Sequence, residues 1–412
     1  MHKVSRSEQQ LEMGWGKPMS RGLLRIVITA LIVASACFAS TLASAKDEIL
    51  VGASVALTGK YSRTGQEQLN GYNMWVDEVN ARGGLLDRKV KLIHYDDESK
   101  PDTGAKLYEK LITGDKVDLL LGPYSSGVTL AASTTAEKHN FPMVSPGAAS
   151  SKIWARGYKN VFGLYTPAEI YMDQILELAQ AKGLKKVALI HEDTAFPRDV
   201  AKAVKAKVAA LGMELVFEEK YSKASTDFAA MLVKLKAKSP QVIVGGSYLP
   251  DSTAFVRQAK EYRFNPKIMA FAVGPGLPDF GANLGSDAEG VMGNTQWEAS
   301  LKLPGAKAFA ERYEQRFGQA PGYHAAGGYG GGQVLEAAVN KAGSLDKDAL
   351  RKALSALEIT TIFGRYQVDA TGKQVGKPGY TIQWIGGERH IVLPQENSTH
   401  AVVYPFKPWK GR

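Results

Sequence analysis

Two turns of small residues in the first half of the sequence could bind an anion. The first is Gly122-Pro123-Tyr124-Ser125-Ser126, which follows an apolar run at 119–121 and precedes a helical segment. The second, Ser-Pro-Gly-Ala-Ala-Ser at 145–150, follows another apolar run. Small residues let a ligand approach the backbone, and a helix start offers unpaired N–H groups and a positive dipole end. Either turn alone is more typical of an ordinary tight turn, but the pair predicts a cradle for a small anion, most simply a carboxylate.

Patterns typical of catalysis or metal binding are missing from the sequence. No two histidines have the H-x-x-x-H spacing of zinc proteases, and there is no G-x-S-x-G nucleophile elbow. The acidic run at 96–98 lacks the spaced oxygen ligands of a calcium loop, so we interpret it as a strand end. His191 and His324 could line a cleft, although a lone histidine is more often structural. We therefore predict no catalytic residues, no metal and no cofactor.

The N-terminal 45 residues differ from the rest of the 412-residue chain. Basic residues precede an apolar run at 26–38, and Ala43-Ser44-Ala45 has the form of a cleavage site, which together predict a secretory signal peptide. The single cysteine, Cys37, lies in this segment, and Ala34 in place of leucine argues against a lipid anchor there. The mature chain would then be periplasmic and free of disulfides. The full 412-residue chain has a net charge of +10, but the lysines of its mature part are spread along predicted helices, so we expect no nucleic-acid partner.

Strand and helix patterns alternate twice along the chain, which predicts an α/β fold with two lobes. In the first half, strands at about 48–57, 89–95, 117–121 and 141–144 alternate with helices at 66–81, after 101 and at 127–139. After an irregular aromatic stretch at 154–167, strands at 186–191, 214–217, 242–244 and 267–271 alternate with helices ending near 211, 238 and 262. Such alternation is typical of parallel, doubly wound sheets, whose ligands bind at the carboxyl ends of the strands.

The last third of the sequence should complete both lobes. A strand at 290–297 is expected to return the chain to the first lobe, where helices at 305–317 and 324–342 complete the packing. The glycine run at 327–332 within the second helix suggests either tight backbone contact or a hinge, since glycine disfavours helices. Short strands at 361–368, 380–385 and 390–393 are expected to form a late β cap on the second lobe.

Five motifs in register resemble type I periplasmic solute-binding proteins. More narrowly, they resemble the branched-chain amino acid and amide class (leucine-binding-protein-like), which delivers ligands to ABC importers. The resemblance extends from Asp47 to about Ile385. The motifs are Val51-Gly52-Ala53 with Leu57-Thr58-Gly59, Asn70-Gly71 with Asn80-Ala81-Arg82-Gly83-Gly84, Tyr95-Asp96-Asp97, Leu121-Gly122-Pro123 with Ser125-Ser126, and Ser145-Pro146-Gly147-Ala148.

The resemblance implies two Rossmann-like lobes that close on a ligand through a three-crossing hinge. Lobe 1 would comprise 46–166 plus 296–358, and lobe 2 would comprise 167–295 plus 359–412, with crossings near 165–167, 295–298 and 357–361. By match to the family, the ligand carboxylate would lie on the two turns, with further contacts from the first strand's loop and from second-lobe aromatics. The implied ligand-binding residues are Thr64, Tyr124, Ser125, Ser126, Ala148, Ala149, Ser150, Phe196, Tyr248, Phe271 and Trp297.

One departure from the family leaves the ligand open. Amino-acid binders of this family pair the ligand ammonium with an acidic residue in the loop that matches 271–276, and that loop has no acid here. Either Asp251, Asp279 or Glu298 substitutes, or the ligand has no ammonium and is an aromatic acid or an amide. The implied partners are a small carboxylate ligand and an inner-membrane permease–ATPase complex, bound by a monomer. The alternative function is a periplasmic receptor that reports ligand to a signalling partner.

Overall fold

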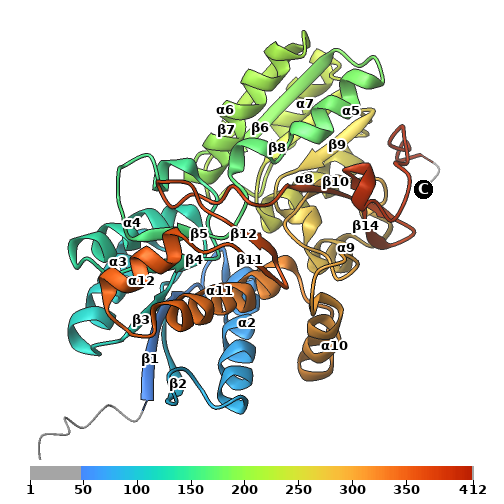
Figure 1. Cartoon of the computed structure of the whole chain (residues 1–412). Coiled ribbons are helices and arrows are strands. Elements are labelled where there is room, and N and C mark those ends of the chain that lie inside the picture. Colours follow the sequence, from blue (N-terminus) through green and yellow to red (C-terminus); the bar gives the residue numbers. More distant parts are fainter. Residues whose placement is uncertain (1–47, 411–412) are drawn as a thin grey trace, which may run out of the picture. The chain divides into compact units, whose positions relative to one another are not determined.

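The protein is described by a computed structural model that covers residues 48–410. The predicted signal peptide, including Cys37, lies outside the described residues. Five parallel strands form the first sheet in the order β2-β1-β3-β4-β5 (Figure 1). They are β1 (Glu48–Val55), β2 (Lys89–Asp96), β3 (Leu119–Leu121), β4 (Met143–Ser145) and β5 (Val161–Gly163). Strand β5 lies within the stretch that the sequence indicated to be irregular, so that prediction was wrong; three residues are too few to show a strand period.

The helices of this first lobe come from two distant parts of the sequence. The N-terminal half supplies α2 (Ser62–Ala81), α3 (Pro101–Glu109) with a π-helical turn at Lys110–Gly114, and α4 (Ser126–Lys138). The C-terminal half supplies α10 (Ala306–Phe317), α11 (Tyr323–Ala342) and α12 (Lys347–Ser355). Helices α2 and α11 lie side by side (Figure 1).

The glycine run of α11 allows its backbone to touch that of α2. A Cβ on Gly71 would lie 2.1 Å from the carbonyl oxygen of Ala325, and one on Gly328 would lie 2.4 Å from that of Gln68. A Cβ on Gly332 would lie 2.2 Å from the indole of Trp75. Of the two interpretations that the sequence allowed for this run, tight backbone contact is therefore the one observed.

The second lobe is built on a mixed seven-stranded sheet of order β14-β13-β10-β9-β8-β6-β7. Its parallel strands are β6 (Lys186–Glu192), β7 (Glu214–Tyr221), β8 (Val242–Gly246), β9 (Ile268–Phe271) and β10 (Met292–Thr295). The antiparallel strands β13 (Tyr380–Ile385) and β14 (Glu388–Leu393) extend it and correspond to two strands of the predicted late β cap. The third strand of that prediction, at 361–368, was wrong, because this stretch lies outside the sheet. Its helices are α5 (Asp173–Ala181), α6 (Ala195–Ala210), α7 (Ala229–Lys238), α8 (Leu249–Glu261) and α9 (Pro278–Leu284).

The strand order requires three passages of the chain between the sheets. The chain leaves the first sheet after β5, returns after β10 to form α10 and α11, and passes again before β13. A separate two-stranded sheet, β11 (Ile359–Thr361) with β12 (Gly364–Tyr366), lies on the last passage. The two-lobed α/β fold is confirmed, whereas the exact lobe boundaries stay a prediction.

Candidate ligand-binding site

Strand-end turns of both sheets meet around a small cavity. From the first sheet, the turns after β3 and β4 contribute, and from the second sheet the segments after β6, β8 and β9 contribute. The cavity measures about 20 Å³, enough for about one water molecule. Its lining residues are Tyr124, Ser125, Ser126, Gly147, Ala149, Tyr165, Tyr171, Phe196, Tyr248, Val273, Tyr323 and His324. We call it the aromatic cavity.

The two serine-containing turns are tied together by one hydroxyl. Ser125 is the N-cap of α4, and its hydroxyl oxygen accepts the Val128 N–H at 3.4 Å. The Ser126 oxygen accepts the N–H groups of Ala149 at 3.1 Å and Ser150 at 3.0 Å. Both acceptor positions of the Ser126 hydroxyl are therefore used, and its proton remains to be donated. At the positive end of α4, this donor suits a carboxylate oxygen.

The walls of the cavity are mostly aromatic rings that contact one another. Tyr124 packs edge-on against His324 with ring centroids 4.8 Å apart, and Phe196 lies 5.2 Å from Tyr171 and 5.7 Å from Tyr248. Each of these side chains is at least 96 % buried, so the rings separate the cavity from bulk solvent. In such surroundings a single hydrogen bond or charge acts more strongly than it would in water.

Two polar groups of the lining lack a hydrogen-bond partner within the described chain. They are the hydroxyl of Tyr165 and Nδ1 of His324, and both are buried. Burial lowers the pKa of His324 to about 3, so its imidazole is neutral at physiological pH. Because unpaired buried polar groups cost free energy and are rare in folded proteins, these two point to a ligand that would pair with them.

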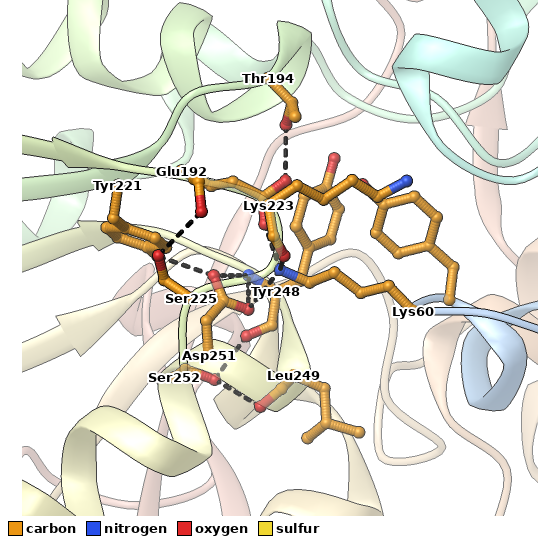
Figure 2. A network of polar contacts seen from close by, with 12 residues as sticks. Lys60, Glu192, Thr194, Tyr221, Lys223, Ser225, Tyr248, Leu249, Asp251 and Ser252 are labelled. Atoms are coloured by element: carbon orange, nitrogen blue, oxygen red, sulfur yellow. Dashed lines mark hydrogen bonds and ion pairs between the residues drawn. The ribbon is translucent and has the colours of Figure 1, made fainter. Parts of the chain in front are cut away.

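A second cavity of about 20 Å³ adjoins the first, since Tyr124 and Tyr248 line both. Lys60, from the loop after β1, also lines it and reaches across to the second lobe. There its ammonium pairs with the carboxylate of Glu192 at the end of β6 and lies 3.3 Å from that of Asp251 in α8 (Figure 2). The Lys60 side chain is 13 % exposed, whereas both carboxylates are fully buried.

The loop that carries Lys60 is fixed by the acidic run after β2. Asp96 accepts the N–H groups of Leu57 at 2.9 Å and Thr58 at 3.2 Å, as well as the Thr58 hydroxyl at 2.6 Å. Asp97 accepts the hydroxyl of Ser54 at 3.0 Å. These carboxylates thus serve the loop itself, and among residues 48–410 no group of three or more His, Cys, Asp or Glu side chains is placed to hold a metal ion.

Six of the predicted site residues line the aromatic cavity, and Thr64 lines the second cavity. The six are Tyr124, Ser125, Ser126, Ala149, Phe196 and Tyr248. Thr64 lies on α2, where its hydroxyl donates to the carbonyl of Tyr61 at 2.8 Å. Tyr124 and Tyr248 also line the second cavity.

The other four predicted residues line neither cavity. Ala148 belongs to a buried apolar cluster of the first lobe, and the Ser150 hydroxyl donates to Asp199 of α6. Phe271 packs edge-on against Phe255 in the second lobe. The indole N–H of Trp297 donates to the carbonyl of Ile362 at 2.8 Å, and its ring packs on Phe309.

Several lining residues were not among those predicted. Tyr165 and Tyr171 follow β5, and Tyr323 with His324 opens α11. His324 was weighed as a cleft residue from the sequence, but neither spacing nor composition distinguishes a cavity tyrosine from a core tyrosine. Of the three acids considered as partners for a ligand ammonium, Asp251 pairs with Lys60, Asp279 with Arg63 at 2.6 Å and Glu298 with Arg389 at 3.1 Å.

A larger groove of about 640 Å³ is a weaker candidate for the ligand site. It is lined mainly by one face of α6 and includes neither Ser125 nor Ser126.

No helix among residues 48–410 combines the length and the apolar character needed to cross a membrane.

Comparisons with known proteins agree with this architecture. A Leu/Ile/Val-binding protein, BraC3 of Rhizobium johnstonii, is 30 % identical over 369 residues, covering 88 % of this chain and 97 % of that protein. The isoleucine complex of the substrate-binding protein LivJ from Streptococcus pneumoniae superposes with a TM-score of 0.77 at 23 % identity, covering 87 % and 100 % of the two chains. A solute-binding protein from Rhodopseudomonas palustris with 3,4-dihydroxybenzoic acid gives 0.76 at 26 % identity, covering 84 % and 95 %.

The sequence profile of one family matches nearly all of the described chain. The family is described as periplasmic binding protein, and the match extends over residues 48–388. Its members are non-enzymatic solute-binding components of transport. The chain therefore belongs to the periplasmic binding protein family, and it is a binding protein rather than an enzyme.

Proposed function

We propose that the chain is the exported solute-binding protein of an ABC importer and that it captures a small carboxylate-bearing solute between its two lobes. It would act in the periplasm, as a monomer, and present the solute to a permease and ATPase in the inner membrane. Family membership supports the transport role, and the lining of the aromatic cavity supports the ligand class. The relatives' names include both amino acids and an aromatic acid, so they leave both kinds of solute open.

The observation that carries the carboxylate assignment is the hydroxyl of Ser126. With both acceptor positions filled by the Ala149 and Ser150 N–H groups, it offers a ligand only its proton. The unpaired Tyr165 hydroxyl is a second donor in the same cavity. The cavity lining contains no carboxylate that would repel an anion. A ligand oxygen with negative charge matches this set better than a neutral or cationic group does.

Lobe closure is the proposed mechanism of capture. About 20 Å³ is far below the 300–1,000 Å³ typical of ligand pockets, so a solute enters only if the lobes or the rings move apart. Contacts across the lobes would have to break on opening. They include Lys60 with Glu192, Arg63 with Asp279 at 2.6 Å, and the Lys223 ammonium, which donates to the carbonyl of Ser99 at 2.7 Å.

A thermal-shift and calorimetric screen of residues 46–412 tests the proposal. The probes are leucine, isoleucine, benzoate and 3,4-dihydroxybenzoate. A probe present at about 100 times its Kd should stabilise the protein by about 2.7 kcal/mol. The absence of binding by every probe and by simple aliphatic acids would contradict carboxylate capture.

The Ser126→Ala variant tests the site itself. It removes the donor together with the acceptor of two backbone N–H groups, so we expect affinity to fall at least tenfold while the protein stays folded. Ser133→Ala is the matched control on the same helix, because that buried hydroxyl donates to the carbonyl of Leu130 at 3.2 Å and lines neither cavity. Equal affinity of both variants would place the ligand elsewhere.

A further inference from the structure

The Lys60 ammonium is the positive partner of two carboxylates in the interior of the second lobe. Glu192 also accepts the Thr194 hydroxyl at 2.8 Å, and Asp251 accepts the Tyr221 hydroxyl at 2.7 Å (Figure 2). Asp251 further accepts the backbone N–H of Tyr248, whose ring lies between the two cavities. The two carboxylates are therefore held in place by the second lobe, and the first lobe brings the cation to them.

The lining of the aromatic cavity contains no carboxylate. Two acids close to it share one cation, and burial raises the pKa of one of them, Glu67, to about 7. Asp279 is paired with Arg63 at 2.6 Å, and Glu67 lies 3.6 Å from the same guanidinium. An ammonium group that entered among the rings would meet no carboxylate in the lining, and burying a charge without a direct partner is unfavourable.

The Lys60 ammonium makes the kinds of contact that the ammonium of a bound ligand would make between the lobes. It lies 5.5 Å from the ring centroid of Tyr248, and it donates to the backbone carbonyl of Lys223 at 3.2 Å. It thus fills an acidic, partly aromatic subsite next to the aromatic cavity. A ligand ammonium could take this subsite only by displacing Lys60.

We propose that Lys60 supplies from within the chain the ammonium that an amino acid would otherwise bring, so that the ligand is a monocarboxylate without an α-ammonium group. This inference rests on the proposed function, because it presumes that a carboxylate is bound at Ser126. Lys60 is then a specificity-determining residue: in the closed molecule its ammonium occupies the position between Glu192 and Asp251, so the ammonium of an amino acid cannot pair there.

Matched pairs of ligands test the specificity in the wild-type protein. The pairs are 3-phenylpropanoate with phenylalanine and 4-methylpentanoate with leucine, with benzoate as an aromatic reference, each titrated calorimetrically at pH 7.5. We expect a deaminated acid to bind at least about 100-fold more tightly than its amino acid, as an unpaired buried charge implies. Amino acids that bind as tightly as their deaminated partners would overturn this inference and leave carboxylate capture intact. Failure of every acid and amino acid to bind the folded protein would instead refute the proposed function and the inference with it.

Chemical rescue of Lys60→Ala tests the subsite independently of the ligand. Without the lysine, Glu192 and Asp251 lose their cation, so we expect the variant's Tm to fall and 1-propylammonium chloride to restore it. The same salt should leave the wild-type Tm unchanged, and sodium chloride should not replace it. Lys100→Ala is the control, because its ion pair with Glu98 at 2.7 Å is exposed and should show neither effect. If the variant is folded but insensitive to the amine, the subsite does not accept an ammonium and the inference is wrong; if it does not fold, the ligand pairs decide.

Discussion

Replacing Tyr165 with phenylalanine should stabilise the unliganded protein and weaken ligand binding at the same time. The Tyr165 hydroxyl is buried without a partner, and the ring is held by stacking on Phe363 at 5.3 Å, which phenylalanine would keep. An unpaired buried hydroxyl costs about 1–3 kcal/mol. Since the cavity has room for about one water molecule, we take the low end and expect a gain of about 1 kcal/mol, or about 2 °C in Tm.

The loss in binding follows from the same hydroxyl. A hydrogen bond to a charged partner contributes about 1.5–3 kcal/mol, so the variant should bind a carboxylate about 10- to 100-fold more weakly. Urea denaturation and calorimetric titration measure the two effects. Tyr366→Phe is the control, because the Tyr366 hydroxyl donates to the carbonyl of Leu354 at 3.0 Å. Loss of this hydroxyl should destabilise the protein, which is the opposite of the effect expected for Tyr165→Phe, and it should leave ligand affinity unchanged. A destabilised Tyr165→Phe protein with unchanged affinity would refute the reasoning.

Three further changes probe other features. Burial raises the pKa of Glu67 from 4.5 to about 7. The contribution of this group to stability is therefore fully present below pH 4.5 and is lost as the pH rises through 7. In Glu67→Gln, the free energy of unfolding measured with urea should change less between these pH values, and the difference from wild type should be about 3 kcal/mol at most. Trp297→Phe should lower stability by about 1–3 kcal/mol without changing ligand affinity; a large affinity loss on titration would return Trp297 to the site. Gly71→Ala should lose about 1–3 kcal/mol by forcing α2 from α11, whereas Gly114→Ala, with 3.7 Å of clearance, should be nearly neutral in the same denaturation assay; equal effects would show that the close contact does not matter.

Most of the fold could be predicted from the sequence because its signals are local. Apolar runs such as 49–55 and 186–190 are long enough to indicate buried strands, and they alternate with amphipathic helices. The three-residue strand β5 was missed because its pairing with β4 is set by tertiary contacts rather than by its own pattern. The short helices α5, α9 and α12 were also not predicted.

The candidate site was predictable only where a turn has its own chemical signature. The serines at 125 and 126 fall at a helix start, and the structure brings them to the cavity. Lys60 carries no such signal, because a lysine in a polar loop is usually solvated, and its two acidic partners lie more than 130 residues away in the sequence. Contacts of that range depend on how the lobes meet, which residue spacing does not encode.

The backbone contact between α2 and α11 also has a consequence for how such a protein could change over evolutionary time. At Gly71 and Gly328 any side chain would collide with a carbonyl oxygen of the opposite helix, so these positions have almost no freedom to vary. The rings around the cavity stand on separate loops and helix starts, where substitutions leave that contact untouched. We expect descendants that acquire new solutes to retain both glycines and to diversify among the rings, so that selection can alter what is carried without rebuilding the lobe that carries it.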